Sequence, residues 1–243
     1  MPAAASPPTL ADTRLALQRL AVHVLARKRH GTTGRFGLRA TPGGFGTPAF
    51  GADDAIEVVR VAGASVVHEV GGDTVAYVDL DGATLGALAE LVAVDLTTEL
   101  SVGDDTPELG AADEPLALDP AAATEVADWF DLGWRALDAV CAGASDPSTI
   151  QLWPEHFDAG CSVGVVPGGA DRCNLGASPG DEAHPEPYLY VGPWSADRPG
   201  DLNYWNAPFG ARLDRADLLV AADPAGAGAE FLQRGLDLLR GGA

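Results

Sequence analysis

An acidic segment at residues 101–119 divides this chain of 243 residues into two halves. The segment carries six acidic residues and two prolines, and it has no basic residue. A stretch with this composition buries little apolar surface, so we expect a linker or a mobile loop there. The break predicts an N-terminal half at residues 10–100 and a C-terminal half at residues 120–243, preceded by a disordered tail at residues 1–9.

The N-terminal half begins with a helical pattern and continues with strand patterns. Apolar residues recur at helical spacing over Leu10–Arg29, and Gly31 is the expected C-cap. Two β-branched runs, Ile56–Val61 and Ser65–Val70, predict a hairpin. Asp81 is the expected N-cap of a short helix. Further strands are expected at Arg35–Thr41, Phe45–Phe50 and Val75–Leu80.

The C-terminal half repeats this order of elements. Asp119 and Pro120 form an N-cap followed by proline at the first helical position, and the next apolar residues keep helical spacing. Asp223 and Pro224 begin the last helix in the same way. Strands are expected at Ile150–Trp153, Phe157–Val165, Tyr188–Val191 and near Trp205–Ala211. The order predicts an α+β fold in which two helix-plus-antiparallel-sheet halves pack as one domain.

Charge is distributed unevenly along the chain, whose formal net charge is −20 at pH 7. Residues 1–39 contain seven basic residues and one acidic residue. This segment either holds an anion between Arg27 and Arg35 or complements its own helix dipole and an acidic partner face. The second interpretation is favoured, because no aromatic residues are interleaved with the basic ones.

Composition also excludes several classes of protein. The strongly acidic balance argues against a nucleic-acid partner, and the lack of a long apolar run argues against a membrane partner. The N-terminus lacks the pattern of a secretory signal, and three cysteines are too few for a disulfide framework. We therefore expect a cytoplasmic protein with free thiols.

Two histidines each precede a carboxylate by two residues. His156 and Asp158 lie at the start of a predicted strand, and His184 and Glu186 lie in a proline-rich run before another. A period of two would place each pair on one face, so all four are candidate catalytic residues. Such groups could bind a single divalent metal ion, or His184 could act as a general base. The remaining interpretation is that they are ordinary polar residues of strands and turns, because no ligand set of known spacing occurs.

Aromatic residues near these pairs predict a ligand-binding cleft. Tyrosine, tryptophan and asparagine side chains in turn-rich chain are typical of a cleft lining, although a buried tryptophan more often fills a core. The candidate lining residues are Trp153, Tyr188, Tyr190, Trp205 and Asn206.

Several runs resemble an uncharacterised conserved family of bacterial hypothetical proteins. The runs are Leu152–Asp158, Asn174–Asp181, His184–Val191 and Trp205–Gly210, and Leu38–Pro48 resembles the first half of the same family. The likeness covers most of the chain outside the acidic segment. It implies one conserved unit, and it implies no assigned activity, substrate or cofactor.

Two functional hypotheses follow from the sequence. The first is a small-molecule-binding protein, or an enzyme, with an aromatic–polar cleft, and the matched spacing of the His–carboxylate pairs supports it. The alternative is a non-catalytic protein-interaction module, which the lack of a recognisable catalytic motif supports.

Overall fold

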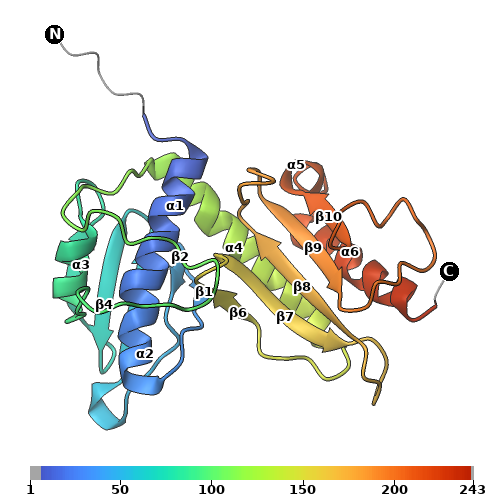
Figure 1. The fold of residues 1–243 in the computed structure, drawn as a ribbon, viewed down its shortest axis with the longest axis horizontal. Coiled ribbons are helices and arrows are strands. Elements are labelled where there is room, and N and C mark those ends of the chain that lie inside the picture. Colours follow the sequence, from blue (N-terminus) through green and yellow to red (C-terminus); the bar gives the residue numbers. More distant parts are fainter. Residues whose placement is uncertain (1–6, 242–243) are drawn as a thin grey trace. The chain divides into compact units, whose positions relative to one another are not determined.

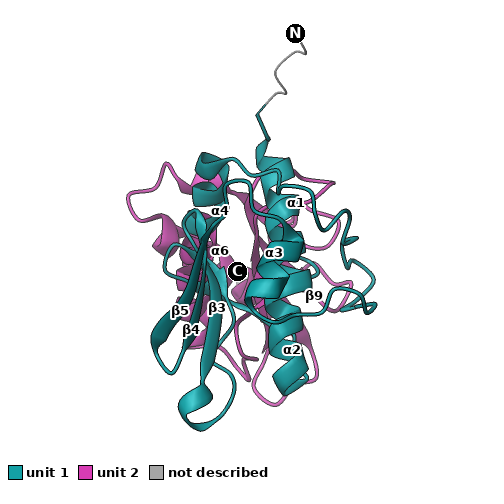
Figure 2. Cartoon of the chain, turned by 90° about the vertical axis from the view of Figure 1, so that its left-hand side faces the viewer, with its two compact units in different colours: residues 1–128, 153–157 teal, residues 129–152, 158–243 magenta. Residues whose placement is uncertain are grey.

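The computed structural model describes residues 7–241 and shows an α+β protein with two antiparallel five-stranded sheets (Figure 1). The predicted fold class is therefore confirmed. The chain divides into two compact units, coloured separately in Figure 2. Unit 1 comprises residues 1–128 and 153–157, and unit 2 comprises residues 129–152 and 158–243. None of the helices within residues 7–241 is long and apolar enough to cross a bilayer.

Unit 1 begins with a helical run made of α1 (Leu10–Leu20), the π-helical segment η1 (Ala21–Ala26) and α2 (Arg27–Thr33). Thr9 caps α1, because its hydroxyl accepts the Asp12 N–H at 3.2 Å and the Asp12 carboxylate accepts the Thr9 N–H at 2.8 Å. Thr9 is thus part of the helix start, whereas residues 1–6 of the predicted tail lie outside the described residues.

The helical run ends later than expected. Gly31 lies inside α2, and Gly34 is the residue that stops the helix, with a left-handed φ of 69°. The Gly34 N–H donates to the His30 carbonyl at 2.8 Å. Glycine is favoured in this conformation because it has no Cβ to clash, so Gly34 is the better cap.

The basic residues of this helical run bond to groups within unit 1. Lys28 Nζ lies 3.0 Å from Glu57 Oε2, and both side chains are largely buried. The arginines donate to main-chain carbonyls instead: Arg19 to Glu108, Arg27 to Asp95 and Thr98, and Arg29 to Gly37. These contacts support the interpretation that the basic segment serves the protein's own fold.

The first sheet has the strand order β1-β2-β3-β4-β5. Its strands are β1 (Arg39–Thr41), β2 (Gly44–Gly46), β3 (Glu57–Ala62), β4 (Ser65–Val70) and β5 (Asp73–Asp79), with the short 3-10 turn η2 (Asp53–Ala55) before β3. The predicted hairpin is confirmed, because β3 and β4 pair along their full length up to Ala62 and Ser65. Helix α3 (Leu85–Leu91) follows, and its N-cap is Thr84 in place of Asp81, since the Thr84 hydroxyl accepts the Ala87 N–H at 3.1 Å.

The acidic segment 101–119 contains no helix and no named strand, and it is fastened to unit 1. Three hydrogen bonds join it to the first helical run: Arg19 Nε to the Glu108 carbonyl (2.9 Å), His23 Nε2 to the Pro107 carbonyl (2.8 Å) and the Asp119 N–H to Thr13 Oγ1 (3.0 Å). The boundary between the units therefore lies further along the chain, after Asp128.

Unit 2 begins within α4 (Pro120–Cys141), so this helix belongs to both units. Asp119 caps it as the sequence predicts, accepting the Ala122 N–H at 2.8 Å. Two further helices are α5 (Arg215–Leu218) and α6 (Pro224–Leu239), and Asp223 caps α6.

The second sheet has the order β10-β9-β8-β7-β6. Its strands are β6 (Gln151–Trp153), β7 (Asp158–Gly164), β8 (Arg172–Ser178), β9 (Tyr188–Pro193) and β10 (Ala211–Asp214). The central strand β8 is absent from the strands expected from sequence. The last strand begins at Ala211, after a loop, and not near Trp205.

One face of the second sheet is apolar and packs on α4 and α6. The residues that alternate along this face are buried: Cys161, Leu175, Ala177, Leu189 and Val191. Gly133 of α4 lies so close that an added Cβ would be 2.3 Å from the Ala177 Cβ. At Gly228 and Gly235 of α6, an added Cβ would likewise come too close to the side chains of Leu189 and Val191, respectively. Small residues on both helices therefore allow a close approach to the sheet.

Candidate functional site

The opposite face of the second sheet carries polar and aromatic side chains. Strand pairing aligns Tyr190 with Gly176 and Arg212, and it aligns Tyr188 with Ser178 and Asp214. Because side chains alternate along a strand, these residues share one face. We call it the tyrosine–aspartate face, defined by Asp158, Ser178, Tyr188, Tyr190, Arg212 and Asp214.

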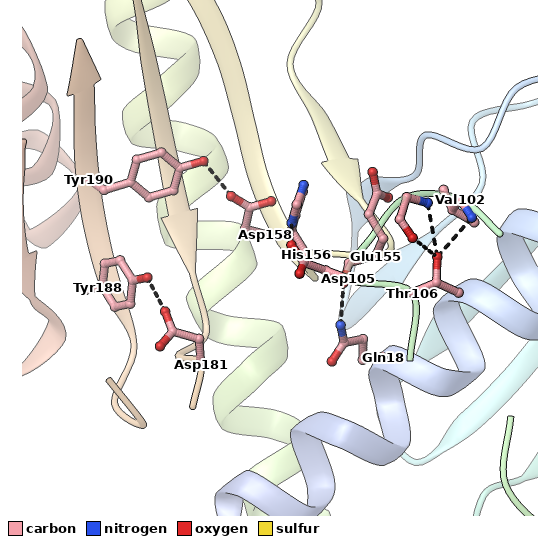
Figure 3. A network of polar contacts seen from close by, with 11 residues as sticks. Gln18, Val102, Asp105, Thr106, Glu155, His156, Asp158, Asp181, Tyr188 and Tyr190 are labelled. Atoms are coloured by element: carbon pink, nitrogen blue, oxygen red, sulfur yellow. Dashed lines mark hydrogen bonds and ion pairs between the residues drawn. The ribbon is translucent and has the colours of Figure 1, made fainter. Parts of the chain in front are cut away.

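Tyr190 reaches across the intervening strand β8 to Asp158 on β7. Its hydroxyl donates to Asp158 Oδ2 at 2.5 Å (Figure 3). The ring passes over Gly176, where an added Cβ would lie 2.2 Å from the ring Cζ. At Gly160 an added Cβ would lie 3.2 Å from the Tyr190 hydroxyl. Two glycines on neighbouring strands therefore make room for one tyrosine that lies across the sheet.

Tyr188 makes a second bond of the same kind. Its hydroxyl donates to Asp181 Oδ2 at 2.5 Å (Figure 3). The other oxygen of Asp181 accepts the N–H groups of Ala183 and His184, both at 2.7 Å, and so fixes the loop before β9. The Phe209 ring stacks with the Tyr188 ring, with centroids 6.3 Å apart and an angle of 22° between the planes.

Both phenols are held in their neutral form. Burial is the main cause that raises the pKa of Tyr188, and the hydrogen bond to Asp181 raises it further. Burial also raises the pKa of Tyr190 well above its ordinary value, and the negative charge of Asp158 adds to this effect. At neutral pH the two tyrosines are therefore hydrogen-bond donors and the two aspartates are acceptors.

His184 has Asp214 as its carboxylate partner. His184 Nε2 lies 3.1 Å from Asp214 Oδ1, and Arg212 Nε lies 2.8 Å from the same oxygen. The His184 ring also meets the Tyr188 ring edge-on, at 5.2 Å between centroids. Glu186, the partner that the sequence spacing suggested, is exposed to solvent. His184 thus has a carboxylate in ion-pair distance, and strand pairing supplies that carboxylate.

His156 lies in a turn and not on a strand. The turn covers residues 154–157, and β7 begins at Asp158. Phe157 has a left-handed φ of 53°, so the alternation of a strand does not extend from Asp158 back to His156. The expectation that these two residues share a strand face is therefore wrong. Within unit 1, His156 Nδ1 lies 2.9 Å from Asp105 Oδ2 (Figure 3).

The four candidate catalytic residues are divided between the two units. His156 belongs to unit 1, whereas Asp158, His184 and Glu186 belong to unit 2. Among residues 7–241, no group of three or more His, Cys, Asp or Glu side chains could hold a metal ion. The described residues therefore offer no support for the metal interpretation of the His–carboxylate pairs.

The predicted lining residues outside β9 have mainly structural contacts. Trp205 Nε1 donates to the Pro199 carbonyl at 2.8 Å. The Asn206 side chain exchanges two hydrogen bonds with the main chain of Arg212, at 2.9 and 2.8 Å. Trp153, at the end of β6, is 42% exposed. Trp205 and Asn206 therefore hold the loop that leads into β10 and so help to place Arg212.

A separate groove of about 800 Å³ is lined by α4, α6 and the loop residues Gly200 and Asp201. Val140 and Leu238 line it, and Arg234 and Asp201 form an ion pair at its edge, at 2.7 Å. The groove has a mixed apolar and charged lining, and nothing in the sequence patterns pointed to it.

The tyrosine–aspartate face is the part of unit 2 where four of the nine sequence candidates meet. It joins Asp158, His184, Tyr188 and Tyr190 to Asp181 and Asp214, two carboxylates that the sequence spacing did not identify. No family model, curated protein or solved structure matches this chain.

Proposed function

We propose that this chain binds a small polar molecule at the tyrosine–aspartate face of unit 2. The observation that carries the proposal is the pair of phenol–carboxylate hydrogen bonds, Tyr188 to Asp181 and Tyr190 to Asp158, on residues two apart in β9. Asp158 is only 8% exposed. A buried carboxylate is costly to desolvate and stabilises a fold less well than an apolar residue, so its presence here supports a binding role.

The chemistry of the face favours a ligand that brings hydrogen-bond donors, such as an amine or a polyol. Carboxylates accept hydrogen bonds and attract positive charge. Asp158 and Asp214 belong to the face, and Asp181 is bonded to it through Tyr188. The rings of Tyr188 and Phe209 add an apolar wall beside them. Such a mixture of a few polar groups and aromatic rings is typical of small-molecule sites.

His184 gives the site the means for proton transfer. Its imidazole nitrogen Nε2 lies 3.1 Å from Asp214 Oδ1, and its ring lies against the Tyr188 ring. An imidazole held in this way is suited to accept a proton from a bound hydroxyl or ammonium group. If the bound molecule is also a substrate, His184 is therefore the general base that we propose for it.

The test is a thermal-shift titration of the full chain with spermidine, glucose and succinate. The two donor-bearing probes, spermidine and glucose, should raise the melting temperature with concentration, whereas the dianionic succinate, which has no hydrogen-bond donor, should not. Tyr190→Phe should remove the shift, because Asp158 loses the donor that orients it.

The matched control is Tyr204→Phe, which removes the same hydroxyl from another buried tyrosine of unit 2. Tyr204 donates to the Phe231 carbonyl at 2.8 Å and takes no part in the face, so this variant should keep the shift. A flat response to spermidine and glucose, or a shift that survives Tyr190→Phe, would contradict the proposal and favour the non-catalytic interaction module.

A further inference from the structure

Two cysteine sulfurs lie in contact inside unit 2. Cys141 is the last residue of α4, and Cys161 is in the middle of β7. Their Sγ atoms are 3.1 Å apart, although both residues are free thiols. A disulfide bond is about 2.05 Å long. The two sulfurs therefore need to approach by only about 1 Å to be joined.

We propose that Cys141 and Cys161 form a reversible disulfide when the protein meets a peroxide. The Cys141 thiolate first attacks one oxygen of hydrogen peroxide, which breaks the O–O bond, gives a sulfenic acid and releases hydroxide. The sulfur of Cys161 then attacks the Cys141 sulfur, and water leaves as the S–S bond forms. Overall, two thiols lose two electrons and two protons, and one hydrogen peroxide is reduced to two waters.

The surroundings of the two sulfurs favour this order of events. Cys141 is half-buried at the end of its helix, whereas Cys161 is 6% exposed, so Cys141 is the more accessible to peroxide. The hydrogen bond from Cys161 lowers the pKa of Cys141, although burial and the nearby Asp138 act in the opposite direction. The same hydrogen bond raises the pKa of Cys161, and burial adds to this effect. Cys141 is thus the attacking thiol and Cys161 the resolving thiol.

The third cysteine provides an internal comparison. Cys173 on β8 is fully buried, and burial raises the pKa of its thiol to about 12. Its Sγ lies 3.5 Å from the Asn174 carbonyl oxygen. Burial shields this thiol from peroxide, and its sulfur contacts a carbonyl oxygen where Cys161 contacts a second sulfur, so Cys173 should stay reduced under the same treatment.

The experiment treats the native full chain with hydrogen peroxide, removes the peroxide, and alkylates the remaining thiols in denaturant before mass spectrometry. The wild type should fall from three alkylated cysteines to one, and digestion should yield one cross-linked peptide pair containing Cys141 and Cys161. Dithiothreitol should restore all three thiols. The oxidised protein should also unfold at a higher urea concentration, because the bridge restricts the unfolded chain.

Variants of Cys141 and Cys173 test which two cysteines form the bridge. Cys173→Ala should still lose both remaining thiols, whereas Cys141→Ser, at the half-buried helix end, should form no intramolecular disulfide. Three thiols that persist in the wild type, at peroxide concentrations that oxidise glutathione, would overturn the proposal. A bridge that includes Cys173, or one that joins two molecules, would overturn it as well.

Discussion

Replacing Gly133 with alanine tests how closely α4 approaches the second sheet. The new Cβ would lie 2.3 Å from the Cβ of Ala177. Carbon atoms in contact are about 3.5–4.0 Å apart, so the helix or the strand must move by more than about 1 Å. Alanine is otherwise the better residue for a helix, so packing and helix propensity act in opposite directions at this position.

The expected result follows from the size of the two effects. Overpacking of a tight contact costs about 1–3 kcal/mol, and an overlap this large belongs in the upper part of that range. The gain in helix propensity is about 1 kcal/mol. Gly133→Ala should therefore lower the free energy of unfolding by about 1–2 kcal/mol, measured by urea denaturation followed by circular dichroism.

A matched control and a compensating change sharpen this test. Gly31 in α2 has nothing within 4 Å of an added Cβ, so Gly31→Ala should raise the free energy of unfolding by about 0.5–1 kcal/mol. Adding Ala177→Gly to Gly133→Ala removes the collision, and the double variant should be more stable than the sum of the single changes predicts. If Gly133→Ala stabilises the protein as Gly31→Ala does, the close helix–sheet approach is refuted.

Two further predictions concern pH and proteolysis. The pKa values of Tyr188 and Tyr190 are raised in the folded state, so the unfolded chain loses these protons first and stability should fall as pH rises above about 10. Urea denaturation across this pH range should show a smaller fall in stability for Tyr188→Phe than for the wild type. An equal fall would contradict the raised pKa of Tyr188. Arg19→Ala removes one of the hydrogen bonds that fasten the acidic segment, so limited proteolysis should cut that segment faster than in the wild type, and unchanged cleavage would show that this bond does not hold it.

Several features that depend on neighbouring residues could be predicted from the sequence, although the caps expected at Gly31 and Asp81 lie at Gly34 and Thr84. The N-caps Asp119 and Asp223 and the hairpin of β3 and β4 are all confirmed. In each case the residues that decide the conformation lie within a few positions of one another, so a short window of sequence contains the whole cause.

The strand β8 was not predicted because its residue types are determined by a side chain on a neighbouring strand. One face of the strand carries Asn174, Gly176 and Ser178, which in a short window look like turn residues. Gly176 is small because the ring of Tyr190 lies across it. That requirement comes from the neighbouring strand, and no local pattern contains it.

The site was predicted in part for the same reason. Tyr188 and Tyr190 share a face, as their spacing implied, but the partner of His184 comes from the pairing of β9 with β10, which sets Asp214 opposite Tyr188. Strand register is a tertiary property, so the contact between His184 and Asp214 could not be predicted from their positions in the sequence. The left-handed conformation of Phe157 prevents His156 and Asp158 from sharing a strand face. Such a conformation at a non-glycine residue can seldom be predicted from a sequence.

The segment 153–157, made of the last residue of β6 and the turn after it, has a consequence for the order in which this protein can fold during synthesis. The turn belongs to unit 1, where Phe157 meets Phe45 edge-on at 5.2 Å and the Glu155 carbonyl accepts a hydrogen bond from Gln18 at 2.5 Å. A nascent chain that has emerged only as far as residue 128 lacks these contacts. Unit 1 is therefore completed only after α4 and β6 have left the ribosome, so the folding of the two units is interleaved in time.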